Sequence, residues 1–233
     1  MKDESKIPPQ WGEDPLSQFI KDAWHNTHAS FANLKPEFTR LKEIHSTFQK
    51  IIDNLLNTPE WFVGFFLMRA HSAYLAGARL SLSGQVTEAY MVLRGCLENS
   101  LYGLHISSNP NTREIWLCRH DDEDSKRKCK NEFTAGNVFK TLESRDIITH
   151  RIAKELYETT IDYGAHPNER GLFSMMRKTQ DEHKIDFMVD YLTGDSMPLR
   201  LGMKMTARVG VCSLFIFQLV FKERFDMNKG VTH

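Results

Sequence analysis

The segment Gln85 to Ile106 constrains the fold most, because its side chains divide into two arcs when placed at about 100° per residue. One arc is an apolar stripe, and the arc beside it is a strip of small side chains that lets another helix approach closely. This helix must therefore pack on two sides, which predicts a bundle of helices. The stripe contains Val86, Tyr90, Leu93, Leu97, Leu101 and Leu104, and the strip contains Ala89, Cys96, Ser100 and Gly103.

Helical periodicity begins at Pro15 and is interrupted at Pro36, Pro59 and Gly84, which predicts four helices up to Ile106. Strand alternation near 173–178 and 185–192 predicts one β-hairpin. We therefore expect a mainly α fold, a bundle of seven or eight helices with one small β-hairpin inserted before the last helix. The later helices are expected around Trp116 and over 131–144, 146–163 and 198–225.

No repeat or low-complexity linker divides the chain, so we expect one helical domain over 15–225, with the hairpin near 173–192. Residues 1–14 are expected to form a flexible N-terminal arm, and residues 226–233 a C-terminal tail. The run "HDDEDSKRKC" is read as a solvated charge run in which Ser125 could cap a helix. The third helix contains "WFVGFFLM", which must be buried or form part of an oligomer interface.

The charge balance and the cysteines narrow the function classes. Thirty basic and thirty acidic residues cancel, which disfavours non-specific DNA binding. Four cysteines without a CxxC pair favour free thiols in a reducing cytosol. The apolar run Val209 to Phe221 is shorter than the roughly 20 residues of a membrane span. We therefore expect a cytoplasmic protein that is not inserted in a membrane.

Motifs of the common enzyme classes are missing from the sequence. It contains no GxGxxG, no GxxxxGK[ST] and no GxSxG, which excludes dinucleotide-binding, P-loop and nucleophile-elbow signatures. The spacings of Cys118, His120 and Cys129, and of His25 and His28, match no zinc pattern. The Glu-x-x-His repeat of di-iron bundles is also missing. We expect neither a metal nor a cofactor.

Arg94 and Glu98 lie one turn apart at the margin of the apolar stripe, where their charges need partners. The arginine fork could bind a phosphate, with the carboxylate fixing its rotamer. A structural ion pair is the alternative explanation.

The segment "YGAHPNERG" concentrates polar groups where a helix is expected to end, at Gly164 and Pro167. Tyr163, His166 and Asn168 could face a cleft, or His166 and Asn168 could only satisfy backbone groups near the helix end. If the two helices pack together, His166 would provide a proton-transfer group beside Arg94.

Three segments together resemble the α-helical HEPN-like proteins: "AYMVLRGCLENSLYGL", the following Trp116 and Arg119, and "YETTIDYGAHPN". The resemblance covers roughly Gln85 to Asn168. Within the HEPN-like group, this segment is most similar in pattern to an uncharacterised prokaryotic branch. It implies a helical fold and a homodimer. Some families of this group are metal-independent ribonucleases of toxin or defence systems, and others have no known catalysis.

The usual mark of these ribonucleases is an arginine separated from a histidine by four to six residues. Four such spacings occur, and they are at Arg40 and His45, Arg113 and His120, Arg145 and His150, and Arg177 and His183. On one straight helix Arg145 and His150 would lie about 140° apart, which disfavours that pair.

The sequence leaves two functional hypotheses. The first is a cleft that binds a phosphate-bearing ligand, RNA or a nucleotide, with Arg94 and His166 as catalytic residues if there is turnover. Its ligand-binding residues would be Glu98, Tyr163, Asn168 and Arg119. The second is a non-catalytic homodimeric interaction or scaffold module.

Overall fold

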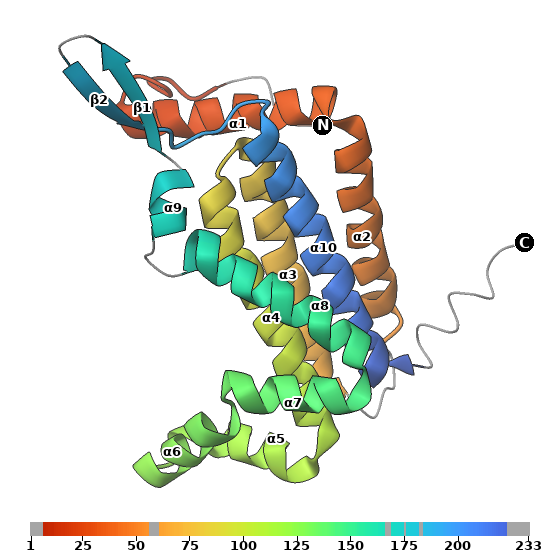
Figure 1. Cartoon of the computed structure of the whole chain (residues 1–233). Helices are drawn as coiled ribbons and strands as arrows, with labels where there is room; N and C mark the ends of the chain where they lie inside the picture. Colours follow the sequence, from red (N-terminus) through yellow and green to blue (C-terminus); the bar gives the residue numbers. More distant parts are fainter. Residues whose placement is uncertain (1–6, 56–60, 166–168, 175, 182–183, 223–233) are drawn as a thin grey trace, which may run out of the picture.

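A bundle of α-helices makes up most of the protein. The computed structural model describes residues 7–55, 61–165, 169–174, 176–181 and 184–222. Within these ranges the only strands form one small hairpin, which projects from one end of the bundle (Figure 1). The predicted mainly α fold is confirmed.

Long helices run along the bundle, and another helix crosses its end (Figure 1). The crossing helix begins after Asp14, whose side chain accepts hydrogen bonds from the backbone N–H groups of Leu16 and Ser17 at 2.9 and 3.0 Å. The crossing helix is α1 (Pro15–Asn33), and the long helices are α2 (Lys35–Asp53), α3 (Trp61–Ser83), α4 (Val86–Ser108) and α10 (Met197–Val220).

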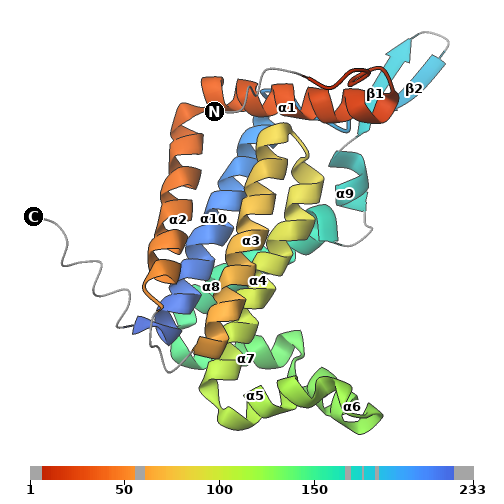
Figure 2. The same cartoon turned by 180° about the vertical axis from the view of Figure 1, so that it is seen from behind.

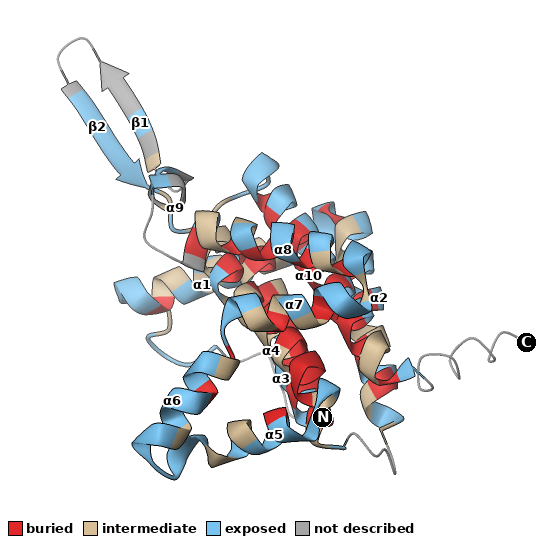
Figure 3. Ribbon diagram, turned by 60° about the horizontal axis from the view of Figure 1, so that its bottom comes forward, coloured by how far each residue is buried: buried red, intermediate tan, exposed pale blue. Residues whose placement is uncertain are grey.

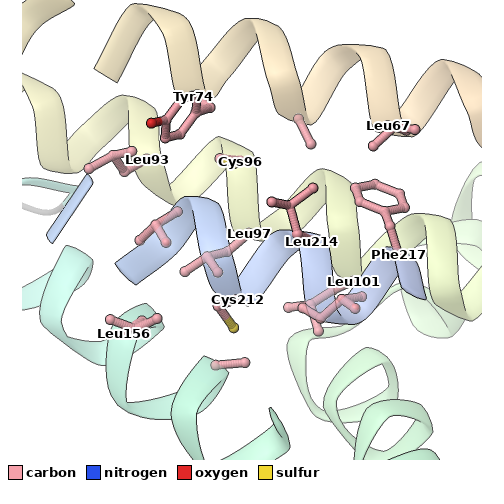
Figure 4. Packing of buried hydrophobic residues seen from close by; sticks show 14 of the residues in the cluster. Leu67, Tyr74, Leu93, Cys96, Leu97, Leu101, Leu156, Cys212, Leu214 and Phe217 are labelled. Carbon is pink, nitrogen blue, oxygen red and sulfur yellow. The ribbon is translucent and has the colours of Figure 1, made fainter. Parts of the chain in front are cut away.

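Helix α4 packs on two sides, as its two arcs predict. The Sγ atom of Cys96 lies 3.2 Å from the hydroxyl of Ser213 in α10. A Cβ atom added at Gly103 would lie 3.1 Å from the ring of Phe217 in α10 and 3.2 Å from Phe66 in α3. The strip of small residues thus lets α3 and α10 approach α4 closely. Figure 4 shows the core that results, with Leu93, Leu97 and Leu101 between these helices and α8.

Shorter helices cover one end and one side of the bundle. They are α5 (Pro110–Leu117), a 3-10 turn (Cys118–His120), α6 (Glu123–Glu132), α7 (Ala135–Arg145) and α8 (Ile147–Thr160). The charge run forms α6, which Figure 3 shows exposed almost throughout, whereas α3 and α4 are largely buried. Asp122, not Ser125, caps α6, because its carboxylate accepts the Ser125 backbone N–H at 2.6 Å. Helix α6 was not predicted, because it buries only Cys129 and so lacks an apolar stripe.

The predicted hairpin is present, with different limits. A π-helical turn (Ile161–Ala165) and α9 (Glu169–Ser174) precede β1 (Met176–Asp181) and β2 (Lys184–Val189), which pair antiparallel with Met176 opposite Val189. The strand predicted over 173–178 therefore begins three residues late, since α9 ends at Ser174. The described part of β2, 185–189, is exposed on both faces, so no buried face fixes the strand limits. Among the described residues, α6 and α9 are two helices that the eight predicted segments do not include.

Helix α10 is a buried helix of the bundle and is longer than the apolar run in the sequence. It is the one helix in the described ranges with the length and hydropathy of a membrane span, and 56% of its apolar window is buried inside the protein. Helix α10 packs against α3 and α4, which buries this apolar surface in the core. Residues 1–6 of the predicted N-terminal arm and all of the predicted C-terminal tail, 226–233, lie outside the described residues. Residues 7–14 of the arm are described and form a turn before α1, in which the Trp11 backbone N–H donates to the Pro8 carbonyl at 3.2 Å.

Candidate functional site

Arg94 and Glu98 form an ion pair on α4, and a tyrosine of α8 joins them. The Nε of Arg94 donates to a Glu98 oxygen at 2.9 Å, and a terminal guanidinium nitrogen donates to the Tyr157 hydroxyl at 2.9 Å. That hydroxyl donates to the same Glu98 oxygen at 3.2 Å. The guanidinium carbon also lies 4.9 Å from the centre of the Tyr157 ring. We call these three residues the Arg94 cluster.

The charges in the Arg94 cluster stabilise one another. Burial disfavours the charged guanidinium, but the hydrogen bond and the charge of Glu98 outweigh it, so the pKa of Arg94 is raised. Burial is also the main cause that raises the pKa of Tyr157, and the Glu98 charge acts in the same direction. Tyr157 therefore keeps its proton at neutral pH and can donate it in a hydrogen bond.

Tyr163 lies in the π-helical turn that follows α8, against the same helix as Arg94. Its ring centre is 5.8 Å from that of Tyr90 on α4, and its side chain is partly exposed. The next residue, Gly164, makes this approach possible. A Cβ atom there would lie 2.5 Å from the Thr87 carbonyl oxygen and 3.0 Å from the Tyr90 Cβ. Because a backbone oxygen cannot move aside, only glycine fits.

We expect Gly164→Ala to lower the free energy of unfolding by about 2 kcal/mol, because it inserts a methyl group into a closed contact. Thermal and urea unfolding would measure the change. Gly95→Ala is the matched control on α4, since a Cβ there meets nothing within 4 Å. Equal stability of the two variants would contradict the close approach of the π-helical turn to α4.

Besides Tyr163, three of the predicted site residues are not part of the Arg94 cluster. His166 and Asn168 lie outside the described residues. Arg119 is exposed on the 3-10 turn. Burial raises the pKa of Tyr102, and the positive charge of Arg119 acts in the opposite direction. Arg119 therefore interacts electrostatically with Tyr102. The structure brings together Arg94, Glu98 and Tyr157, and Tyr163 lies six residues after Tyr157 in the π-helical turn.

A cavity of about 330 Å³ lies beside the Arg94 cluster, between α7 and α8. Tyr157 contributes to its wall, so one residue joins the cavity to the cluster. The wall also contains His150, Lys140 and Lys154, together with Glu143 and Glu158. We call this space the α7–α8 cavity.

His150 is the histidine that the structure places in this cavity wall. Its Nδ1 is buried and has no hydrogen-bond partner among the described residues, and its ring lies edge-on to Phe139 at 5.9 Å. A buried ring nitrogen without a partner is costly in a purely structural role. His150 is thus available for a ligand or for proton transfer.

Arg145 and His150 do not share one straight helix. Helix α7 ends at Arg145, and Asp146 caps α8 by accepting the backbone N–H groups of Ile148 and Thr149 at 2.9 and 3.1 Å. The two residues therefore belong to different helices, and an angle on a common helix has no meaning. His150 lines the cavity, whereas Arg145 is exposed and is not part of the wall.

No protein-family model, curated protein or solved structure matches this chain. The functional argument therefore rests on the geometry of the site. The described residues hold no group of three or more histidine, cysteine or acidic side chains that could bind a metal ion. All four cysteines are free thiols.

Proposed function

We propose that the α7–α8 cavity binds a phosphate-bearing ligand, RNA or a nucleotide. The observation that carries this proposal is the set of Lys140, Lys154 and His150 around one cavity. Within the described parts of the chain neither lysine has an ion-pair partner, so both ammonium groups can pair with a ligand. The two lysines can donate hydrogen bonds to phosphate oxygens, with Glu143 and Glu158 of the same wall balancing their charge, and the unpartnered Nδ1 of His150 can hydrogen-bond to the ligand.

The Arg94 cluster has a supporting role in this proposal. Arg94 is held by Glu98 and Tyr157, so its charge is largely compensated inside the protein. We propose that it fixes the Tyr157 hydroxyl at the cavity wall. Tyr163, His166, Asn168 and Arg119 stay candidates for contacts with a longer ligand.

Metal-independent ribonuclease activity, which the HEPN-like resemblance implies, is part of the same proposal. Such cleavage needs one group that takes the proton of the ribose 2′-hydroxyl while its oxygen attacks phosphorus. A second group must protonate the 5′ oxygen that leaves. We propose His150 for one of these roles, and His166 stays the candidate for the other.

The binding test compares Lys140→Gln/Lys154→Gln with the wild type, using a labelled short single-stranded RNA and fluorescence anisotropy at several salt concentrations. Losing two phosphate contacts should reduce the slope of log affinity against log salt by about 1.4, since each contact contributes roughly 0.7. Lys42→Gln/Lys50→Gln, on exposed α2 positions, is the matched control. An unchanged slope in the cavity variant would contradict the site.

Cleavage is tested separately with His150→Ala and His166→Ala on RNA and on its 2′-deoxy analogue. Loss of cleavage in both variants would assign the two proton-transfer roles. If the wild type bound RNA without cleaving it, the protein would be a phosphate-binding module, and the ribonuclease proposal would be contradicted.

A second candidate function, the homodimeric interaction module, is favoured by the exposed face of α3. Six exposed positions on this helix repeat at alternating spacings of four and three, which is the pattern of a helix–helix seam. Figure 2 shows α3 and α4 on the side of the bundle nearest the viewer, with α10 behind them. These positions, the α3 stripe, are Trp61, Phe65, Met68, Ser72, Leu75 and Arg79.

The α3 stripe is complementary to a second copy of itself. Suppose that two α3 helices pair antiparallel, with the two-fold axis crossing the α3 stripe at the level of Ala70. Phe65 then meets Leu75 of the other copy. Met68 then meets Ser72, and Trp61 meets Arg79, a cation above an aromatic ring. Every apolar member thus obtains a partner. Trp61 is 61% and Phe65 52% exposed in one chain, so pairing would remove much apolar surface from water.

We expect Phe65→Glu to raise the dimer dissociation constant by about 100-fold, because each dimer would bury two unpaired carboxylates. Analytical ultracentrifugation over a concentration series measures this. Leu16→Glu, at another exposed apolar position, on α1, is the control. A monomeric wild type at all concentrations, or an unchanged Phe65→Glu dimer, would contradict pairing through the α3 stripe.

A further inference from the structure

The outer face of α10 lies in a groove of about 770 Å³, bounded by α2 on one side and α8 on the other. Figure 1 shows α10 in front of α3 and α4, with α2 beside it and α8 crossing it. This α10 groove is separate from the α7–α8 cavity, since the two share no wall residue. Its volume is within the range typical of small-molecule sites.

The floor and walls of the α10 groove are apolar along most of its length. Ile44 of α2, Ile152 of α8, and Val211, Cys212 and Phe215 of α10 all line it. Val211 and Phe215 are 39% and 50% exposed, although they belong to the most apolar helix of the bundle. An apolar ligand would remove this surface from water, which favours its binding.

One end of the α10 groove carries positive charge. Glu37 of α2 pairs with Arg200 of α10 at 3.3 Å, and both helices run in the same direction (Figure 1). One turn further along, Arg40 of α2 and Lys204 of α10 come to the same level of the groove wall. Within the described residues neither of these two cations has an ion-pair partner.

Two other cations of the groove are already paired. Arg200 is paired with Glu37 and with Asp195, and Arg208 is paired with Glu155 at 2.8 Å. Of the wall residues without an ion pair among the described residues, Arg40 and Lys204 are positive and Glu43 is negative. Arg40 and Lys204 are therefore the two cations that an anionic head group can contact.

We propose that the α10 groove binds a single-chain amphiphilic carboxylate, of the fatty-acid class, with its head at Arg40 and Lys204. Its chain lies along α10 towards Phe215. Lys204 and Phe215 are eleven positions apart on one helix, which corresponds to roughly 16 Å and suits an extended acyl chain. A carboxylate presents two oxygens, so one head group can accept a hydrogen bond from each of the two cations.

The ligand is held without a covalent bond. Cys212 is the one thiol in the wall, and burial raises its pKa to about 12. The thiol therefore stays protonated and is a poor nucleophile at neutral pH. The contacts of the carboxylate head fix the orientation of the ligand, and burial of the acyl chain against the apolar floor provides most of the affinity.

The test measures binding of dodecanoate to the full chain by isothermal titration calorimetry, below the concentration at which the probe forms micelles. We expect one dodecanoate per chain and binding at least about tenfold weaker in Arg40→Gln/Lys204→Gln, because two charge-assisted contacts are lost. Ala207→Trp, which fills the middle of the groove, should abolish binding. Lys42→Gln, on the exposed side of α2, is the matched control.

Several outcomes would overturn the proposal. They are no binding of dodecanoate by the wild type, equal affinity for dodecanoate and the neutral dodecanol, or full binding by Ala207→Trp. Binding of anionic phospholipid vesicles without binding of free dodecanoate would make the face a membrane contact and would equally overturn it. Circular dichroism establishes that each variant is folded. Because the RNA-binding variants lie in another cavity, failure here leaves the phosphate-ligand proposal untouched.

Discussion

Lowering the pH from 7 to 4 is expected to reduce the free energy of unfolding by about 3 kcal/mol through one buried histidine, His71 of α3. Its Nε2 lies 2.8 Å from the Nδ1 of His45 on α2, and its ring stacks on Phe48 at 5.0 Å. Burial, and secondarily the charge of His45, lower the pKa of His71 from 6.5 to about 4. A pKa lowered from 6.5 to about 4 corresponds to about 3 kcal/mol in the free energy of unfolding.

The direction follows from which state takes up the proton first. As the pH falls, the unfolded chain protonates this histidine near pH 6.5, but the folded chain does so only near pH 4. The stability is therefore full above pH 6.5 and is lost progressively down to pH 4. Burial also lowers the pKa of His105, which adds a change of the same sign.

Urea unfolding of the wild type, His71→Gln and the control His25→Gln at pH 4, 5, 6 and 7 measures this effect. His71→Gln should flatten the dependence on pH, whereas His25→Gln, at an exposed position of α1, should keep it. If His71→Gln retained the full pH dependence, another group would be responsible for it.

The long helices could be predicted from the sequence because each buries an apolar stripe. The limits of α4, for example, follow from Gly84 before it and from the end of the stripe. The segments that differed from prediction, α6, α9 and the hairpin limits, bury little or lie on the surface. In such segments no buried face imposes a periodic spacing on the apolar residues, so the sequence does not define where a helix or strand begins and ends.

The candidate site could be predicted in part. The exposed margin of α4 identified Arg94 and Glu98, because charges beside an apolar stripe need partners. Tyr157 was missed, although it opens the segment that contains Tyr163, since its role depends on how α8 lies on α4. The boundary between two helices at Asp146 was predicted, but the α7–α8 cavity depends on how α7 and α8 pack against each other, which the spacing of residues in the sequence does not report.

The proposed surfaces lie on different parts of the bundle and can act together. The α3 stripe is on the side nearest the viewer in Figure 2, whereas α8 and α10 are nearest in Figure 1, the opposite view. A dimer through α3 would therefore leave the α10 groove and the α7–α8 cavity open. Dimerisation and ligand binding are then separate tests, and one result does not decide the other.

Arg94→Ala is expected to lower the free energy of unfolding by about 3 kcal/mol. The guanidinium side chain is only 23% exposed, and its loss leaves the Glu98 carboxylate and the Tyr157 hydroxyl without their donor and counter-charge. Arg127→Ala is the matched control, because Arg127 also forms a 2.9 Å ion pair but is 71% exposed. The control should cost about 0.5 kcal/mol, as exposed pairs do.

A double-mutant cycle of Arg94→Ala with Tyr157→Phe separates the structural role of the Arg94 cluster from a direct role in binding. If Tyr157 and Arg94 act as one unit, the combined loss of stability should be smaller than the sum of the single losses by about 1 kcal/mol or more. Measured on the same variants, RNA affinity should fall with Tyr157→Phe, because the cluster presents this hydroxyl to the cavity. Unchanged stability of Arg94→Ala together with lost RNA binding would instead make Arg94 a direct ligand contact and contradict its positioning role.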